Sequence, residues 1–101
     1  MNENVVIIPT FNEKENITIT ISEISKLKTK FDIVVVDDNS PDKTGEIVKN
    51  IIESKKYNFN IHLIERNDKN GLGSAYIEGF NYATLKLVLE QFTDALLKYN
   101  S

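Results

Sequence analysis

The segment Ile33-Val34-Val35-Val36-Asp37 constrains the fold more than any other part of the chain. Its consecutive aliphatic residues do not alternate with polar ones, so a strand formed here would be apolar on both faces. Such strands lie inside parallel sheets that helices cover on both sides. The sequence therefore predicts an α/β fold with this strand at its centre.

Two carboxylates, Asp37 and Asp38, follow at the end of this predicted strand. Ser40 and Pro41 then suit the N-cap and the first position of a helix. Ligands of open α/β sheets bind outside the carboxyl ends of the strands, so we expect a binding site here. The alternative is an ordinary strand-to-helix turn in which the carboxylates only cap and order the backbone.

Two further strands are expected on either side. One covers Val5–Ile8 and ends at Pro9, and a less apolar one covers Asn60–Glu65, nearer the sheet edge. The run Ile17–Ile21 alternates like a strand as well, but parallel neighbouring strands need a crossover, which is usually helical. We therefore predict a helix in this region.

That first helix has a recognisable start and an apolar face. Asn12, with Glu15 three residues later, resembles a capping box. Isoleucines at helical spacing then form one face, which we expect to extend to Leu27. A second helix is expected from about Pro41 to Lys55, with its apolar residues on one side.

The C-terminal third is predicted to be helical. The Gly71-Leu72-Gly73-Ser74 turn opens a third helix, and from Ala83 to Ser101 apolar residues follow three- and four-residue spacing. We interpret residues 1–83 as one β-α-β-α-β-α segment of a partial Rossmann-like parallel sheet. Residues 84–101 add an amphipathic helix to the same domain. The stripe serves core or oligomer packing and comprises Leu85, Val88, Leu89, Phe92, Ala95, Leu96 and Tyr99.

Composition narrows the class of protein. A chain of 101 residues forms one domain at most, and its net charge of −3 provides no basic footprint for nucleic acid. It has no cysteines, which excludes disulfides and thiolate metal sites and fits a reducing compartment. Its apolar runs are far shorter than the roughly 18 residues that span a bilayer. We expect a soluble, cytoplasmic protein.

Three motifs in this order resemble the family 2 glycosyltransferases, and most closely the polyprenol (dolichol) phosphate mannosyltransferases. They are the Pro9-Thr10-Phe11-Asn12-Glu13 loop, residues 33–44, and the Gly71 turn followed by Gly79-Phe80. The resemblance covers about residues 4–83. It implies the GT-A fold, GDP-mannose as the nucleotide-sugar donor, Mg²⁺ or Mn²⁺ as cofactor, and a polyprenyl phosphate as acceptor. A full-length relative could also associate peripherally with the membrane.

The resemblance also implies roles for individual residues. Phe11 stands where the family often has Tyr, and its ring would pack on the base or ribose. The Asp38 carboxylate would accept both N–H groups of a guanine edge, Lys69 would face the diphosphate or sugar, and Asp37 would order the turn or reach a ribose hydroxyl. The implied donor-binding positions are Pro9, Phe11, Glu13, Val36, Asp38 and Lys69.

The sequence departs from the family after the Gly79-Phe80 helix. The family continues with a strand that ends in an Asp-x-Asp motif, which holds the metal. Here Asp94-Ala95-Leu96 offers one carboxylate inside a predicted helix. Asp94 is therefore a candidate metal ligand that needs partners from elsewhere. Because that motif and the acceptor site are missing, we expect the chain to bind nucleotide at most, without turnover.

A non-catalytic interaction domain derived from this fold is the second interpretation. If the family's next strand is absent, the first strand has an open edge that needs covering. The helix over residues 84–101 could cover it, or two chains could exchange elements in a homodimer. The sequence does not distinguish GDP from UDP as the nucleotide.

Overall fold

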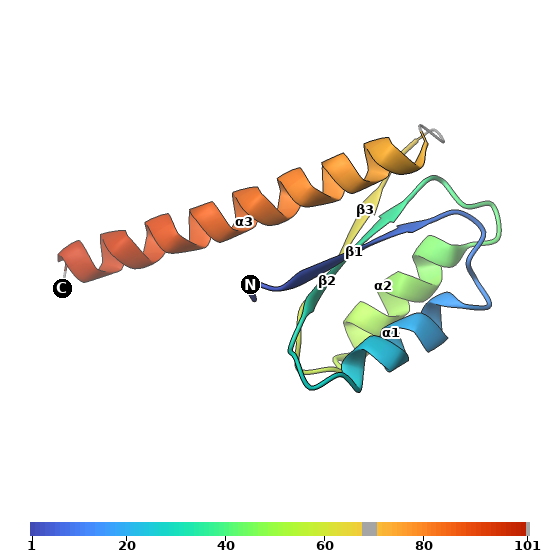
Figure 1. Cartoon of the computed structure of the whole chain (residues 1–101), viewed down its shortest axis with the longest axis horizontal. Helices are drawn as coiled ribbons and strands as arrows, with labels where there is room; N and C mark the ends of the chain where they lie inside the picture. The colour runs from blue at the N-terminus through green and yellow to red at the C-terminus, as the bar shows by residue number, and fades with distance from the viewer. Residues whose placement is uncertain (68–70, 101) are drawn as a thin grey trace.

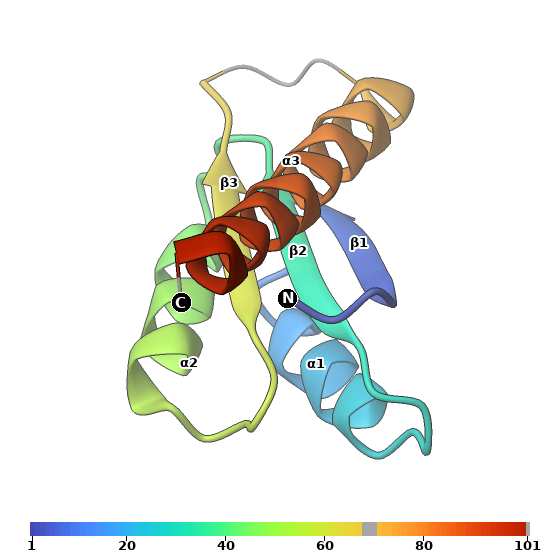
Figure 2. The ribbon, with the colours of Figure 1, turned by 90° about the vertical axis from the view of Figure 1, so that its left-hand side faces the viewer.

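The computed structural model describes residues 1–67 and 71–100, without the side chains of 95, 96 and 98–100. A three-stranded parallel sheet has the order β1-β2-β3, with α1 and α2 on one face and α3 on the other (Figures 1 and 2). This confirms the predicted α/β class, which is consistent with a partial GT-A or Rossmann-like fold. The elements are β1 (Val5–Thr10), α1 (Ile17–Ser25), β2 (Asp32–Asp37), α2 (Thr44–Ser54), β3 (Ile61–Glu65) and α3 (Leu72–Asn100).

The central strand is β2, and all six of its residues are buried. Ile33 and Val35 pack in the core beneath α1 and α2, whereas Val34 and Val36 pack in the core beneath α3. Alternate side chains of a strand point to opposite faces, so an apolar run fills two cores at once. The prediction of a two-sided apolar strand is confirmed, and β3 lies at an edge as expected.

The ambiguous run 17–21 forms α1, which confirms the predicted helix. Ile17 and Ile21 are buried in the core against β2 and α2. The expected extension to Leu27 is wrong, because the helix ends at Ser25 and Leu27 is exposed. The residues after Ser25 lead the chain back to the amino end of the sheet, where β2 begins at Asp32.

The predicted capping box at Asn12 is also wrong. Asn12 has a φ of 55°, in the left-handed region, and α1 begins only at Ile17. The backbone N–H of Asn12 donates to the Ser40 hydroxyl at 2.9 Å, so this residue joins the following loop instead of capping its own helix. A partner from another loop has displaced the local capping interaction.

The predicted start of α2 is corrected in the same way. The helix begins at Thr44 instead of Pro41, because the Ser40 hydroxyl donates to the Asp37 carboxylate at 2.6 Å and does not cap a helix. The Asp42 carboxylate accepts the Thr44 backbone N–H at 3.0 Å. Burial raises the pKa of Asp42, but hydrogen bonds from Thr44 and Lys14 outweigh it and lower that pKa.

Helix α3 runs without a break through the two segments that were considered separately in the sequence. Ala75 and Ala83 are buried against β2, and Gly79 lets the helix approach the sheet closely. A Cβ at Gly79 would lie 2.5 Å from Cγ2 of Ile7 and 3.2 Å from Cγ2 of Val36. The N-terminal half of α3 therefore packs through small residues.

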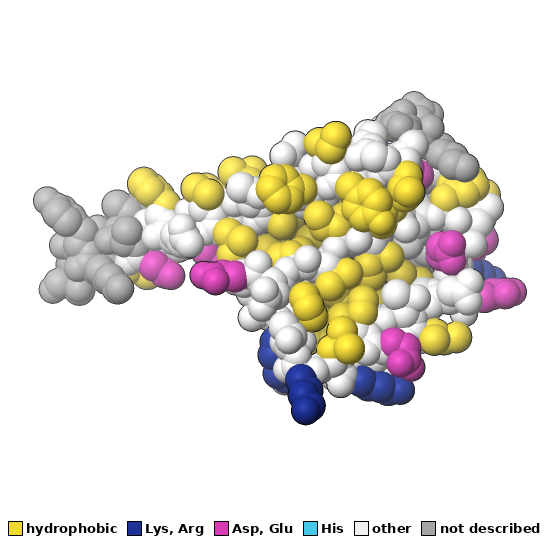
Figure 3. Space-filling view, in the orientation of Figure 1, with side chains coloured by type: hydrophobic (Ala, Val, Ile, Leu, Met, Phe, Trp, Pro, Cys, Tyr) yellow, Lys and Arg dark blue, Asp and Glu magenta, His cyan; other side chains and the backbone are white. Residues whose placement is uncertain are grey.

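The C-terminal half of α3 extends past the sheet, which makes the molecule 49 Å long and 29 by 22 Å across (Figure 1). Apolar side chains gather along α3 and on the face between it and the sheet (Figure 3).

Strand β1 is an outer strand, and α3 contacts its face. Strand β1 also continues through Pro9 to Thr10 instead of ending at Pro9, since an outer strand can accommodate a proline on its unpaired side.

Candidate functional site

The carboxyl ends of the three strands meet at one edge of the sheet. There the loops after β1 and β2 are joined by hydrogen bonds. The loop after β1 is held to the loop after β2 by the Asn12–Ser40 hydrogen bond and by a second one. In the second, the Glu13 backbone N–H donates to the Thr44 hydroxyl at 3.1 Å. These contacts place the residues after β1 beside the carboxylates at the end of β2.

Asp37 is 2% exposed and uses its carboxylate to order the turn. One oxygen accepts hydrogen bonds from the hydroxyls of Thr10 and Ser40, each at 2.6 Å. The other accepts the backbone N–H of Ser40 at 3.0 Å. Of the two roles expected for Asp37, the structure therefore favours ordering the turn.

Asp38 is also buried and forms a two-point ion pair with Arg66. The Arg66 Nε donates to one carboxylate oxygen of Asp38, and Nη2 donates to the other at 2.8 Å. This fork geometry is the strong form of a carboxylate–guanidinium contact. The hydrogen bond to Asp38 raises the pKa of Arg66 further above its usual value.

The remaining N–H groups of Arg66 reach α3 and the turn before it. Nη1 donates to the Ser74 hydroxyl at 2.8 Å and to the Glu78 carboxylate at 3.4 Å, and Nη2 donates to the Gly71 carbonyl at 3.2 Å. Together with the two bonds to Asp38, these occupy all five guanidinium donors. Arg66 thus fixes the start of α3 relative to the end of β2.

A cavity of about 220 Å³ opens between β1, β2 and the start of α3. It combines apolar walls with two carboxylates, one of which is held by Arg66. It is smaller than the roughly 300–1,000 Å³ of typical small-molecule sites, so it suits one ring system better than a whole nucleotide-sugar. Its lining residues are Pro9, Thr10, Phe11, Glu13, Asp38, Gly71 and Leu72.

Comparison with known proteins identifies the family of this chain. The family described as "Glycosyl transferase family 2" matches residues 5–95 of the chain. The chain belongs to this family. The resemblance noted in the sequence is therefore confirmed, and the match extends past the expected residue 83.

Three curated relatives of this chain have names that combine mannose with a polyprenyl lipid. The polyprenol monophosphomannose synthase of Mycolicibacterium smegmatis is 38% identical over 76% of the chain and 28% of its own length. The undecaprenyl-phosphate mannosyltransferase of Micrococcus luteus is 35% identical over 94% of the chain and 36% of its own length. The dolichol-phosphate mannosyltransferase of Pyrococcus furiosus is 43% identical over 78% of the chain and 22% of its own length. The chain thus spans about a quarter to a third of these proteins.

The structure brings together four of the six predicted donor-binding residues. Pro9, Phe11, Glu13 and Asp38 all line the 220 Å³ cavity. Val36 does not line it, because its side chain is completely buried beneath α3 and only its backbone lies near this edge. Lys69 lies outside the described residues.

The described residues of this chain offer no cluster of metal ligands at the cavity. Within the described part of the chain, no three His, Cys, Asp or Glu residues gather as a metal site would require. Asp94 follows Leu72 by 22 positions on α3, which places it about 33 Å along the helix from the cavity. The structure therefore does not bring Asp94 together with the donor-binding residues.

Arg66 was not among the residues that the sequence analysis singled out. The one available signal was its position directly after a predicted strand, at the edge where ligands bind. Leu72 was recognised only as part of a glycine turn, yet it forms a wall of the cavity. Gly71 has a φ of 93°, in the left-handed region that glycine adopts without strain. This agrees with the glycine turn predicted from the sequence.

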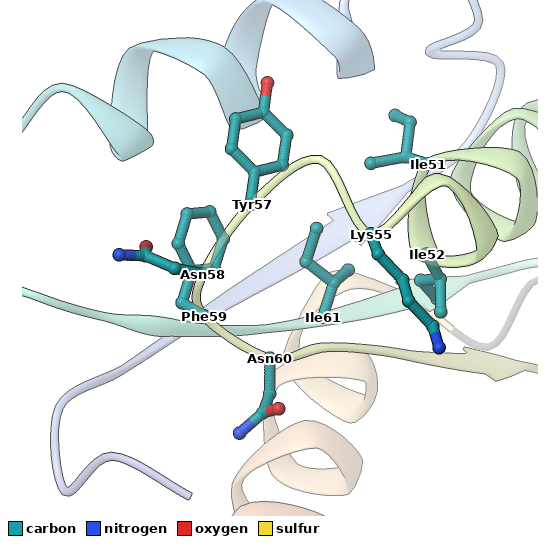
Figure 4. Close-up of a pocket in the computed structure, with 8 residues that line it drawn as sticks. All are labelled: Ile51, Ile52, Lys55, Tyr57, Asn58, Phe59, Asn60 and Ile61. Atoms are coloured by element: carbon teal, nitrogen blue, oxygen red, sulfur yellow. The ribbon is translucent and has the colours of Figure 1, made fainter.

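A larger cavity, of about 350 Å³, lies at the opposite, amino-terminal edge of the sheet between the end of α2 and the start of β3 (Figure 4). Tyr57 and Phe59 stack there with ring centroids 5.1 Å apart, and both pack against the core. None of the predicted site residues lines it.

Within the described residues, no helix has both the length and the apolar character to cross a bilayer.

Proposed function

We propose that this chain is the donor-binding segment of a polyprenol-phosphate mannosyltransferase and that its cavity binds the base of GDP-mannose. The observation that carries the proposal is that Pro9, Phe11, Glu13 and Asp38 line one cavity at the carboxyl edge. The membership of family 2 and the names of the relatives support the reaction class. The lipid acceptor is a polyprenyl phosphate, and the homologous whole proteins supply the precedent for it.

Asp38 supplies the polar contact in this proposal. Its carboxylate has further acceptor capacity after the two bonds from Arg66, because each ionised oxygen carries two lone-pair sites. The adjacent N–H groups of guanine would donate to these sites. The Phe11 ring and the Pro9 ring would cover the faces and edges of the base, as apolar walls do in most small-molecule sites.

The diphosphate and sugar would extend out of the cavity, since its volume of about 220 Å³ accommodates little beyond the base. Lys69 remains the proposed cation for these groups. Because Asp94 lies far along α3 and no described cluster fits a metal, we propose binding without turnover for this 101-residue chain. Formation of a mannosyl lipid by the purified chain would contradict this part.

Calorimetric titration of the full chain with GDP and with UDP tests the proposal. We expect saturable binding of GDP and weaker binding of UDP, whose base lacks the paired N–H edge. Titration with and without Mn²⁺ tests for a metal, and we expect equal affinities in both. Absence of binding to either nucleotide would overturn the proposed function.

A pair of phenylalanine variants makes the test specific to the cavity. Phe11→Ala removes the ring that lines it and should weaken GDP binding about 10-fold, as loss of one base–aromatic contact does. Phe80→Ala removes an exposed ring on α3 that does not line the cavity, so its affinity should match the unmodified chain. Equal effects of the two substitutions would count against the site.

The open edge of β1 favours a second candidate function, a self-associating interaction domain. Strand β1 is an outer strand, and among the described residues none forms a strand on its other side. Exposed edges of this kind can pair with other chains. We therefore propose that two copies of the chain form a homodimer through this edge. Sedimentation equilibrium of the full chain measures its dissociation constant.

A further inference from the structure

Arg66 adjoins the carboxylate that we propose as the polar contact of the cavity. Asp38 lines the cavity, whereas Arg66 does not line it and is 8% exposed. The guanidinium holds both oxygens of Asp38, one through Nε and the other through Nη2 at 2.8 Å. Arg66 therefore lies next to the proposed binding site without bordering the space that a base would occupy.

The guanidinium of Arg66 has no N–H group left for a ligand. Nη1 donates to the Ser74 hydroxyl and to the Glu78 carboxylate, and Nη2 also donates to the Gly71 carbonyl. Together with the two bonds to Asp38, these contacts use all five donors. A base in the cavity would reach Arg66 only by breaking one of them. The geometry thus indicates a group that acts on Asp38 and not on the ligand itself.

The two-point contact fixes the orientation of the Asp38 carboxylate. The terminal torsion of an aspartate side chain has a broad minimum, so a carboxylate that nothing holds samples a range of orientations. Two parallel hydrogen bonds from a planar guanidinium remove this freedom. Each oxygen keeps a second lone-pair site. A ligand therefore meets acceptor sites that are already fixed in space, which lowers the entropic cost of binding.

We propose that Arg66 is a positioning residue that sets the base preference of this site by holding the Asp38 carboxylate in a fixed plane. The inference rests on the proposed nucleotide binding and concerns the class of base that the site selects. A fixed carboxylate accepts two adjacent N–H groups at once, and guanine presents such a pair through N1 and its 2-amino group. Hypoxanthine has the same ring system without the amino group, so it presents only one. Arg66 favours bases with two donors without touching them.

Base preference separates this positioning role from a role in stability. A substitution that only lowers the fraction of folded, binding-competent chain weakens the apparent affinity for every nucleotide by the same factor. The ratio of two nucleotide affinities then stays constant. A substitution that releases the Asp38 carboxylate changes the ratio, because it weakens the two-donor base more than the one-donor base. The ratio of the dissociation constants for inosine diphosphate (IDP) and GDP is therefore the quantity to measure.

Calorimetric titration of the full chain with GDP and with IDP tests the proposal. The unmodified chain should bind GDP at least about 10-fold more tightly, as one further hydrogen bond to a charged group provides. In Arg66→Lys the preference should fall below about 3-fold, because an ammonium keeps the charge without the planar fork. Glu78→Gln is the matched control, since it alters another contact of Arg66 and leaves the bonds to Asp38. Its preference should equal that of the unmodified chain.

A second measurement needs no substitution, so it decides the proposal even where Arg66→Lys does not fold. Arg66 is the only arginine in the sequence, and its Nε–H signal in the NMR spectrum of the ¹⁵N-labelled chain is therefore identified at once. Saturation with GDP should shift this signal and leave its slow exchange with water unchanged, because the bond to Asp38 persists. Exchange that becomes about 10-fold faster in the GDP complex would show that Arg66 leaves Asp38, which would overturn the proposal.

The outcomes separate the positioning role from nucleotide binding itself. An unmodified chain that binds neither GDP nor IDP would overturn the proposed function and this role with it. Binding of both nucleotides with equal affinity would overturn the positioning role and leave nucleotide binding intact. The same holds for a GDP preference that Arg66→Lys retains, since Arg66 would then serve the fold alone. Circular dichroism of each variant shows whether the fold is retained.

Discussion

At the scale of single residues, the contact between Arg66 and Asp38 joins three elements that meet at the candidate site. Arg66 follows β3, Asp38 follows β2, and Ser74 and Gly71 belong to the start of α3. Both charged side chains are less than 10% exposed. A buried pair of this kind costs desolvation free energy, so its effect on stability depends on both partners being present.

Arg66→Ala should lower the free energy of unfolding by about 3–5 kcal/mol, because it leaves the Asp38 carboxylate buried and unpaired. Urea denaturation followed by circular dichroism measures this. Lys49→Ala serves as the control, since Lys49 pairs with Glu65 through side chains that are about half exposed. Its effect on the midpoint should be small. Equal losses from both variants would show that the Arg66 contact is no stronger than a surface pair.

His62 is expected to make stability depend on pH. Its Nδ1 lies 3.1 Å from the Tyr82 hydroxyl, and Nε2 is buried with no hydrogen-bond partner among the described residues. Burial and the positive charges of Lys86 and the N-terminus lower the pKa of His62, against the opposing effect of Asp32 and Glu90. The folded state therefore binds this proton less readily than the unfolded chain does.

Stability should accordingly be constant above the unfolded pKa of about 6.5 and should fall as the pH decreases below it. Unfolding by urea at pH 7.5, 6.5 and 5.5 measures the decline. His62→Gln removes the titrating group and should flatten the profile in this window. A profile that is the same in both proteins, or one that rises on acidification, would contradict the assignment.

At the scale of elements, α3 has two halves with different surroundings. The N-terminal half packs on the sheet through Ala75, Gly79 and Ala83. The C-terminal half extends past the sheet and exposes Leu85, Val88, Leu89 and Phe92. One continuous helix thus leads from the candidate site at its start to exposed apolar side chains near its end.

Gly79→Ala should destabilise the fold by about 1–3 kcal/mol, even though alanine favours a helix by about 1 kcal/mol over glycine. The added Cβ would lie 2.5 Å from Cγ2 of Ile7, which forces α3 away from the sheet. Gly73→Ala is the matched control on the same helix, because nothing lies within 4 Å of a Cβ there. Thermal unfolding should show a lower midpoint for the first variant and an unchanged or higher one for the second.

At the scale of the whole molecule, the proposed binding site and the exposed C-terminal half of α3 lie far apart. The cavity lies at the carboxyl edge of the sheet, beside Leu72. Phe92 is 20 positions, or about 30 Å, further along α3. A side chain at that distance does not contact a base in the cavity, so its substitution should leave nucleotide affinity unchanged.

The Phe92→Glu variant provides the measurement, because Phe92 is exposed on α3. Its GDP affinity in calorimetry should equal that of the unmodified chain. A difference of more than about 3-fold, which is about 0.7 kcal/mol, would show that the C-terminal half of α3 is coupled to the cavity.

Local patterns were enough to predict the elements and the family. The aliphatic run at 33–36 predicted the central strand, and isoleucine spacing together with the crossover argument predicted α1. The loop after β1 and the Gly71 turn carried the likeness to family 2, which the comparisons confirmed. The site prediction converged on the same edge, because parallel strands bring their carboxyl ends together. The individual donor-binding roles remain predictions.

The sequence by itself determined which segments are apolar on one or both sides, and hence the order of strands and helices. Only the tertiary structure decided the partners of the polar residues. Ser40 binds Asp37 and Asn12 instead of capping α2, and Arg66 finds Asp38 across 28 positions of chain. It also decided that Leu85, Val88, Leu89 and Phe92 are exposed, whereas Ala75 and Ala83 pack on the sheet. Apolar periodicity is local, whereas hydrogen-bond partners and helix orientation depend on residues that folding alone brings together.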